Sequence, residues 1–432
     1  MGKNGRLGKD YGRVVGGRKE TKRQCPGFVK KADPKVKPSE EKVEASSEPA
    51  IPVELQQLLL NIFKTTFPSI LASDMLPPLL QSVKSALYER DFTRAFGKKE
   101  NLEVYSIRWS PSRALSYLSI LVGVQKHLAN IFPLCRTNRS REDVSSLADV
   151  SNAFKSTMPV TCFGGGAAEI VAFGGFLRYL QNVRQDLPDD RLPIEEGLMN
   201  LSVSDTSSDI GSVLGTHSAV VASLDVEAMD LAIPEKVSEL ELVLIDAAQW
   251  QDVIHKLYDS LTTPAPLSKY ASASVREANS PLISPQDIST TFLTEDILGM
   301  DQSRMVDLIG KRPMLLTLLF TLNELYTFSV GKTTTFLLNL TAATKPSSLL
   351  LVVDSPGSYS ETMVGAEAKK YPMQWLLDHT LLEVQKSRGQ ESSPHWAKVV
   401  SEDSRWFRVA EDLRYPIPLE NMRYQMHLYR RI

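Results

Sequence analysis

The spacing of apolar residues divides the chain into a helical part and an alternating part. In residues 55–67 and again in 79–87, apolar positions recur three and four apart, which is the period of an amphipathic helix. A third helix is predicted to begin at residues 110–111, because Ser110 can cap a helix and Pro111 suits its first position. These patterns predict a helical module over residues 51–150.

From residue 151 onward, short apolar runs alternate with helical patterns. Buried strands that alternate with helices are typical of an α/β fold with a parallel sheet, so residues 151–432 are predicted to form one such domain. The last run, 422–430, alternates apolar with polar residues and predicts an antiparallel strand added to the sheet. The predicted parallel strands are 160–163, 242–245, 290–293, 315–322 and 349–353.

Two segments contain too few apolar residues to build a core, and we expect both to be disordered. Residues 1–50 are rich in Gly, Lys and Pro, and residues 184–238 form an acidic insertion within the α/β domain. The first 37 residues hold twelve Lys/Arg against three Asp/Glu, a net charge of about +9, although the whole chain carries −2. A basic tail on an acidic body favours a polyanionic partner or a nuclear address.

The composition excludes several classes of protein. With 42% hydrophobic and 23% charged residues, the chain is neither collagen-like nor disordered throughout. No apolar run reaches the roughly 18 residues of a membrane span, and no secretory signal is expected. The three cysteines lie far apart and the six histidines do not cluster, so we expect a reducing compartment and no metal site.

The most informative motif is a predicted strand that meets three glycines and then a helix. Gly164, Gly165 and Gly166 allow a tight turn and the close approach of a ligand. The helix that follows offers free N–H groups and the positive end of its dipole. The run departs from the G-x-G-x-x-G pattern because Glu169 stands in place of its last glycine. We expect a cofactor to lie against this turn.

Carboxylates follow the next two predicted strands. Asp246 ends one of them, where it could accept both ribose hydroxyls of a nucleotide-like cofactor, although a run ending at Asp225 is a rival for this strand. Glu295 and Asp296 follow the next strand. A carboxylate there could recognise the amine of a base, or it could cap the short helix that follows.

A third polar group follows residues 315–322, the apolar run that we expect at the centre of the sheet. Asn323, Glu324 and Tyr326 come directly after it. In open α/β sheets the carboxyl edge of the central strands faces the ligand crevice, so these residues are candidates for chemistry. The alternative is that they only cap the following helix.

In this order, the glycine turn, the two acidic strand ends and the polar group resemble the class I S-adenosylmethionine-dependent methyltransferases. Further segments resemble the fungal 25S rRNA uridine-N3 methyltransferases more narrowly. The resemblance covers roughly residues 55–432, apart from the acidic insertion. The segments that carry it are residues 108–115, 162–169, 321–326, 353–359 and 420–429.

The resemblance implies a seven-stranded Rossmann-like sheet, S-adenosyl-L-methionine as methyl donor, and a uridine of large-subunit rRNA, free or in a pre-ribosome, as substrate. It also implies a nuclear or nucleolar location, with the cytoplasm as a further one. On this hypothesis Glu324 is the general base, and Asn323 and Tyr326 orient the uracil. Arg108 and Arg113 would then hold RNA phosphates.

One departure from the family pattern and two alternatives stay open. Many class I methyltransferases carry an acidic residue two positions before the first glycine, where this chain has Cys162, so the contact of that carboxylate must be absent or replaced. A nucleotide-cofactor dehydrogenase shares the glycine turn and the acidic strand end. A catalytically degenerate methyltransferase fold that acts as a ribosome-assembly factor shares every motif. The sequence predicts no oligomeric state.

Overall fold

The computed structural model describes residues 51–128, 131, 156–185, 237–277, 279–357, 361–364, 369–383 and 395–432. The predictions about the basic tail and Asp225 lie outside these ranges, as do nearly all of those about the acidic insertion. The structure therefore bears on the helices from residue 51 and on the α/β domain.

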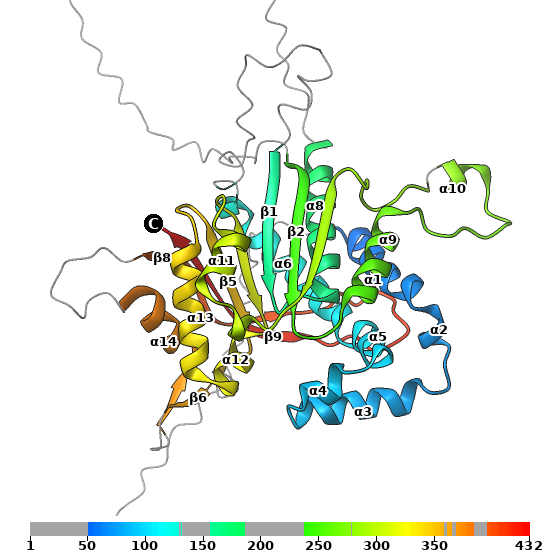
Figure 1. Cartoon of the computed structure of the whole chain (residues 1–432). Coiled ribbons are helices and arrows are strands. Elements are labelled where there is room, and N and C mark those ends of the chain that lie inside the picture. Colours follow the sequence, from blue (N-terminus) through cyan, green and yellow to red (C-terminus); the bar gives the residue numbers. More distant parts are fainter. Residues whose placement is uncertain are drawn as a thin grey trace, which may run out of the picture. The chain divides into compact units, whose positions relative to one another are not determined.

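The α/β domain is built on a seven-stranded sheet with the order β3-β2-β1-β4-β5-β9-β8 (Figure 1). The strands from β3 to β5 pair in parallel, and β9 is antiparallel to both of its neighbours, which confirms the predicted reversed strand. The strands are β1 (Ser156–Phe163), β2 (Val237–Asp246), β3 (Ile288–Thr294), β4 (Leu315–Leu319), β5 (Leu349–Asp354), β8 (Trp396–Phe407) and β9 (Met422–Arg431), with a separate ribbon of β6 (Glu361–Val364) and β7 (Lys369–Pro372).

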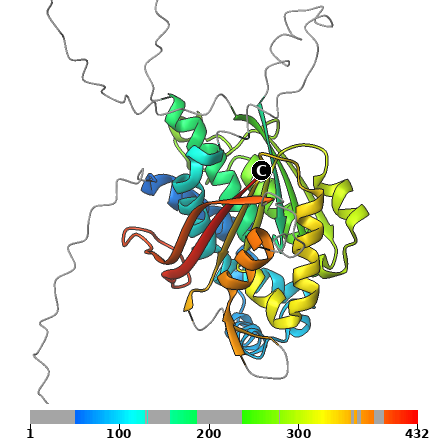
Figure 2. The same cartoon turned by 90° about the vertical axis from the view of Figure 1, so that its left-hand side faces the viewer.

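Helices cover both faces of the sheet because its central strands are apolar on both sides. Every residue of β4 and β5 is buried. One core cluster joins α1 (Val53–Thr66), α6 (Ser110–Leu128), α8 (Ala167–Gln185) and α9 (Gln251–Thr262) to one face. A second cluster covers the other face, and Figures 1 and 2 show the sheet between the two layers. It draws on η3 (Ile297–Gly299), α11 (Gln302–Ile309), α12 (Leu322–Phe328), α13 (Val330–Ala343), α14 (Met373–Asp378) and η5 (His379–Glu383).

The short N-terminal helices lie at the carboxyl edge of the parallel strands. Figure 1 shows α3 (Leu76–Tyr88), α4 (Phe92–Phe96) and α5 (Lys99–Arg108) below the sheet, where β1, β2 and β3 end. The short helices α2 (Pro68–Leu71) and α10 (Ala273–Glu277) complete the described helices. The helices predicted from residues 55–67, 79–87 and 110–111 are α1, α3 and α6, whereas α4 and α5 were not predicted. The edge of the sheet where ligands are expected is therefore partly walled by helices.

The prediction that the fourth strand runs to residue 322 is wrong. β4 ends at Leu319, and α12 begins at Leu322. Phe320 takes a left-handed backbone conformation with φ of 56° while its N–H still donates to Val353 O at 2.7 Å, so the chain leaves the sheet there. Asn323, Glu324 and Tyr326 are consequently helical residues rather than strand-end residues.

Candidate active site

Backbone hydrogen bonds join the carboxyl ends of β1, β2 and β3. The N–H groups of Gly164 and Gly165 both donate to Ile245 O, at 2.7 and 3.1 Å. The N–H of Glu295 donates to Asp246 O at 3.0 Å. The glycine turn and the two acidic strand ends, predicted separately from the sequence, therefore lie side by side at one edge of the sheet.

A cavity of about 920 Å³ opens at this edge. Its volume is near the upper end of the roughly 300–1,000 Å³ typical of small-molecule sites, so it has room for a cofactor and an acceptor base together. The strand ends line one side, and α4, α5 and the first turns of α6 line the other. Of the predicted site residues, those that line it are Gly164, Gly166, Asp246, Glu295, Asp296, Glu324 and Arg113.

The three glycines of the turn have different surroundings. Gly164 has a φ of 75°, and a Cβ there would lie 2.4 Å from the Thr321 hydroxyl oxygen, so only glycine fits. Gly166 lines the cavity, and a Cβ on it would make ordinary contact with the Trp250 ring at 3.4 Å. Gly165 faces the core, where a Cβ would lie 2.7 Å from that of Cys162. Gly165 therefore shapes the turn without lining the cavity.

This difference predicts opposite results for two substitutions. Gly165→Val is expected to lower the free energy of unfolding by about 1–3 kcal/mol or more, because its side chain overpacks the core beside Cys162. Gly166→Ala is expected to leave stability nearly unchanged, because Trp250 lies at ordinary contact distance. Urea unfolding of the two variants measures both effects. Equal stabilities would contradict the orientation of the turn.

Glu169 is a carboxylate of the cavity that was not predicted as a site residue. It lies in the first turn of α8 with only 5% of its surface exposed, and its Oε2 accepts the N–H of Gly166 at 2.8 Å. Burial raises the pKa of Glu169 to about 7, although the Gly166 N–H opposes the rise. The spacing Gly-x-x-Glu before an apolar run resembles a capping box, and that signal could have indicated it.

Asp246 is the last residue of β2, the strand that pairs with β1 and β3, as predicted. Its Oδ1 accepts the N–H of Ala248 at 2.7 Å, which fixes the carboxylate at the start of the loop toward α9. Burial raises the pKa of Asp246 to about 6. A carboxylate held in this way at the cavity wall can accept hydrogen bonds from hydroxyl groups of a ligand.

Glu295 and Asp296 follow β3 and already have partners within the protein. Arg304 on α11 donates from Nε to Glu295 at 3.0 Å and forms an ion pair with it. Asp296 accepts the N–H of Leu298 at 3.0 Å and so caps η3, as one of the two alternatives predicted. Both line the cavity, and their contact with a base stays a prediction.

The structure separates the three residues predicted for chemistry. Glu324 lines the cavity and lies 3.6 Å from the guanidinium of Arg90, which reaches it from the turn between α3 and α4. Burial raises the pKa of Glu324, and Arg90 lowers it in part. The described lining does not include Asn323 or Tyr326. Asn323 donates its backbone N–H to Asp354 Oδ2 at 2.9 Å, and the Tyr326 side chain, also on α12, is buried in the second core cluster.

The two arginines predicted to hold phosphates differ in position. Arg113, in the first turn of α6, donates to the Tyr105 hydroxyl, and its guanidinium lies over the Tyr105 and Phe320 rings, 5.6 and 5.2 Å from their centroids. It points into the cavity wall. Arg108, at the end of α5, forms an ion pair with Glu420 and lies over the Trp109 ring. A phosphate contact stays a prediction for both.

Aromatic residues of the cavity were also missed by the sequence analysis. Tyr117 on α6 is 1% exposed, lines the cavity, and its hydroxyl has no hydrogen-bond partner within the described part of the chain. A buried hydroxyl of this kind is costly unless a ligand satisfies it. Tyr105, Trp109 and Trp250 also line the cavity, and the Tyr105 ring packs against both Trp109 and Trp250. These aromatic residues are spaced along the sequence as core residues are, so the sequence pattern did not indicate that they line a site.

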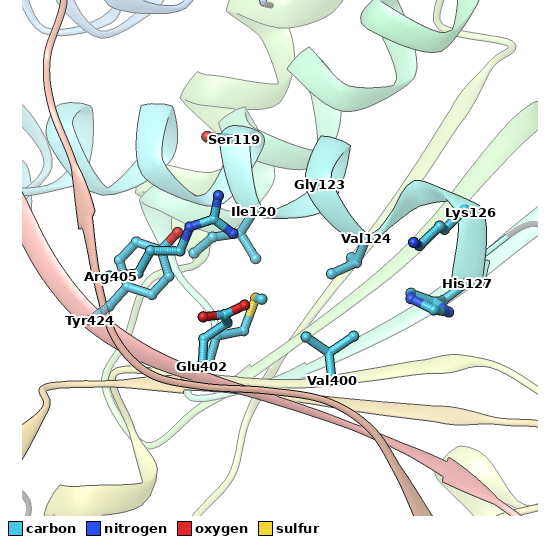
Figure 3. A pocket seen from close by; sticks show the side chains of 11 residues that line it. Ser119, Ile120, Gly123, Val124, Lys126, His127, Val400, Glu402, Arg405 and Tyr424 are labelled. Carbon is cyan, nitrogen blue, oxygen red and sulfur yellow. The ribbon is translucent and has the colours of Figure 1, made fainter. Parts of the chain in front are cut away.

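A second, smaller cavity of about 190 Å³ lies elsewhere, between the last turns of α6 and the strands β8 and β9 (Figure 3). Arg405 and Glu402 of β8 reach toward α6 there, and Lys126 and His127 line its other end. None of the strand-end carboxylates lines it. The larger cavity is therefore the candidate active site.

The comparison with known families decides the class of protein. Residues 63–430 match the family described as "Putative SAM-dependent methyltransferase". The chain belongs to this family. It is 31% identical over 380 residues to the 25S rRNA (uridine(2843)-N(3))-methyltransferase of Saccharomyces cerevisiae, an alignment that covers 86% of this chain and 85% of that enzyme.

Solved structures match the chain more distantly. The carbon methyltransferase CurJ is 10% identical, with 88% of this chain and 71% of that chain covered and a TM-score of 0.32. A protein of Listeria monocytogenes described as a "putative class I S-adenosylmethionine-dependent methyltransferase" is also 10% identical, with 88% of both chains covered and a TM-score of 0.30. The assignment to the family rests on the sequence match.

The chain is therefore an S-adenosylmethionine-dependent methyltransferase, which decides against the dehydrogenase alternative. The residues of the larger cavity suit this cofactor. Gly164 permits close approach of a ligand, Asp246 offers a carboxylate, and the unpartnered Tyr117 hydroxyl needs a polar partner. Within the described ranges there is no cluster of His, Cys, Asp and Glu that could hold a metal, and no helix long and apolar enough to span a membrane.

Proposed function

We propose that this chain methylates N3 of a uridine in large-subunit rRNA. The observation that carries the proposal is the similarity to the yeast uridine-N3 methyltransferase, which extends over 86% of this chain and 85% of that enzyme. The cavity agrees with this chemistry, because Glu324, in the first turn of α12, lines it together with Gly164 and Gly166 of the glycine turn.

Methylation of N3 requires loss of the N3 proton, because the uracil imide is mostly neutral near pH 7. S-adenosylmethionine supplies an electrophilic methyl group when it is bound. We assign proton abstraction to Glu324, whose burial makes it a stronger base than an exposed carboxylate. The guanidinium of Arg90, which lies 3.6 Å from the Glu324 carboxylate in a turn with a left-handed φ of 56° at Arg90, supports this assignment because it can orient the carboxylate.

The acceptor uridine must leave its helix or loop to reach this cavity. Phe320 lines the cavity and is the proposed apolar contact for such a base, with its ring packed against the Arg113 guanidinium at 5.2 Å and the stacked Tyr117 ring at 6.3 Å. Arg108, which does not line the cavity and is paired with Glu420, and the basic tail are the proposed contacts for the flanking phosphates. A basic tail and an rRNA substrate together favour a nuclear or nucleolar location, which we include in the proposal.

The proposal is tested with the purified full chain, labelled S-adenosylmethionine and transcripts of large-subunit rRNA domains. We expect label in one transcript, and N3-methyluridine as the modified nucleoside by mass spectrometry. Replacement of the mapped uridine by cytidine serves as the control and should abolish labelling. Cofactor binding without any transfer, on transcripts or on pre-ribosomes from cells lacking the protein, would favour the assembly-factor alternative. Label in another base would contradict the uridine assignment.

A further inference from the structure

Two side chains of opposite charge share the active-site cavity without pairing. Glu169 belongs to the first turn of α8, and Arg113 belongs to the first turn of α6. Arg113 lowers the pKa of Glu169, and Glu169 raises the pKa of Arg113, so the two charges are close enough to interact. The ion pairs within 4 Å among the described residues nevertheless do not include this pair. Both line the same cavity, next to the glycine turn.

Each of these charges has only part of its hydrogen-bonding capacity filled. Glu169 accepts the backbone N–H of Gly166 and is stabilised further by its own backbone N–H, but no side chain of the described residues donates to it. Arg113 donates to one neutral hydroxyl, that of Tyr105, and otherwise lies against aromatic rings. Glu169 is buried and Arg113 is half-buried, and a charge withdrawn from water is costly to the extent that it lacks an opposite charge or several hydrogen bonds. The pair is therefore arranged for a ligand with both a positive and a negative group.

The hydroxyl of Tyr117 is a third group in the cavity that lacks a full set of hydrogen-bond partners. The hydroxyl of Tyr117 is buried, lines this cavity and has no partner within the described part of the chain. Tyr117 lies one turn after Arg113 on α6, so the two side chains lie on the same side of that helix. A hydroxyl beside a guanidinium is suited to share a carboxylate with it.

We propose that Glu169 and Arg113 bind the two charged groups of the amino-acid end of the cofactor. Glu169 accepts from its ammonium group, and Arg113, with the hydroxyl of Tyr117, donates to its carboxylate. The assignment also accounts for Cys162, which occupies the usual acidic position but is buried in the core at 1% exposure. The carboxylate comes instead from the helix, seven residues later. The inference rests on the cofactor of the family and not on the RNA substrate.

The test compares two ligands that differ only at this end. S-adenosylhomocysteine carries the amino-acid group, and 5′-methylthioadenosine lacks it. Titration calorimetry on the full chain measures the affinity for each ligand. Glu169→Gln is expected to lower the affinity for S-adenosylhomocysteine about tenfold or more, and the affinity for 5′-methylthioadenosine less than twofold. Arg113→Gln and Tyr117→Phe should show the same selectivity, with a smaller effect for Tyr117→Phe. Asp246→Asn is the control and should weaken both ligands alike.

A pH series separates a ligand contact from a helix-capping role. The pKa of Glu169 is about 7 without ligand, so the affinity for S-adenosylhomocysteine should rise between pH 6 and pH 8 as Glu169 ionises. Asp246, Arg113, Tyr105 and Tyr117 face the same space, and Asp246 also titrates near pH 6. The pH dependence that belongs to Glu169 is therefore the part absent for 5′-methylthioadenosine and lost in Glu169→Gln.

Three outcomes would overturn the proposal. The first is an equal loss for both ligands, and the second is an unchanged affinity for S-adenosylhomocysteine in the folded variants. The third is the same pH dependence for the two ligands. Each would leave Glu169 as a cap of α8 alone. Thermal unfolding without ligand shows whether each variant is folded, and if Glu169→Gln is not, Arg113→Gln and Tyr117→Phe still decide the question.

Discussion

Replacement of Glu324 by glutamine is expected to lower the turnover of methyl transfer by about 10²–10⁴-fold. Glutamine keeps the size of the side chain but cannot accept the N3 proton. The affinity for the cofactor should barely change, because the lost contact forms in the transition state. Single-turnover transfer to a substrate transcript measures the rate. The matched control is Glu402→Gln, which alters a half-buried carboxylate of the second cavity. Its rate of methyl transfer should be close to that of the wild type.

The pH dependence of the same reaction identifies the base. Burial raises the pKa of Glu324, and only its ionised form accepts a proton, so the wild-type rate should fall as pH falls through that pKa. The acidic limb should be missing in Glu324→Gln. In Arg90→Ala it should move to higher pH, because the guanidinium that favours the carboxylate is gone.

A nearly normal rate for Glu324→Gln would contradict this assignment. Another carboxylate such as Asp354 would then be the alternative acceptor, and burial raises the pKa of Asp354 to about 6. Its two oxygens, however, already accept the backbone N–H groups of Asn323 and Ser355, at 2.9 and 2.8 Å. The geometry therefore gives Asp354 the role of holding the start of α12, and thereby Glu324, in place.

Much of the sheet could be predicted because each central strand is a short apolar run that ends in a polar residue or glycine. The strands before Gly164 and Asp246 are of this kind, and the alternating run 422–430 marked the reversed strand. The edge strand β8 was missed. It carries the polar stretch 401–405, most of it exposed, so one face never shows an apolar pattern.

The interior of the site was harder to predict because it depends on which way side chains point. Phe320 ends β4 through a left-handed φ that no sequence pattern requires, and this moves Glu324 into a helix. Asn323 and Glu324 are neighbours, yet only Glu324 faces the cavity. Arg113, predicted to hold an RNA phosphate, lines the cavity because Phe320, which its guanidinium contacts, comes from an element far away in the sequence.

Asp246→Asn is expected to weaken cofactor binding and to stabilise the ligand-free protein at the same time. The pKa of Asp246 is about 6, above its ordinary 3.8, because burial disfavours the charged form. The folded chain thus holds this proton more tightly than the unfolded chain does. Ionisation of Asp246 therefore costs folding free energy as pH rises from about 4 to 6, and the cost persists at pH 8.

Asparagine avoids this cost because it has no charge. A pKa difference of about two units corresponds to at most about 3 kcal/mol, and the partly open cavity reduces it, so we expect Asp246→Asn to be about 1–3 kcal/mol more stable at pH 8 and equal to wild type near pH 4. The affinity for S-adenosylhomocysteine should fall about 5–50-fold, because the ribose hydroxyls lose a charged acceptor. Urea unfolding at both pH values and titration calorimetry measure the two effects.

The opposite signs of the two effects are what distinguish a binding residue from a structural one. Replacing a carboxylate that only supports the fold would lower the stability of the chain. Replacing a buried carboxylate that serves ligand binding raises the stability of the ligand-free chain, because its charge is unfavourable until the ligand is bound. Asp307→Asn, on the exposed face of α11, is the matched control and should change neither quantity. A less stable Asp246→Asn with unchanged affinity would show that Asp246 only anchors the Ala248 turn, and that the ribose is held by other residues of the cavity.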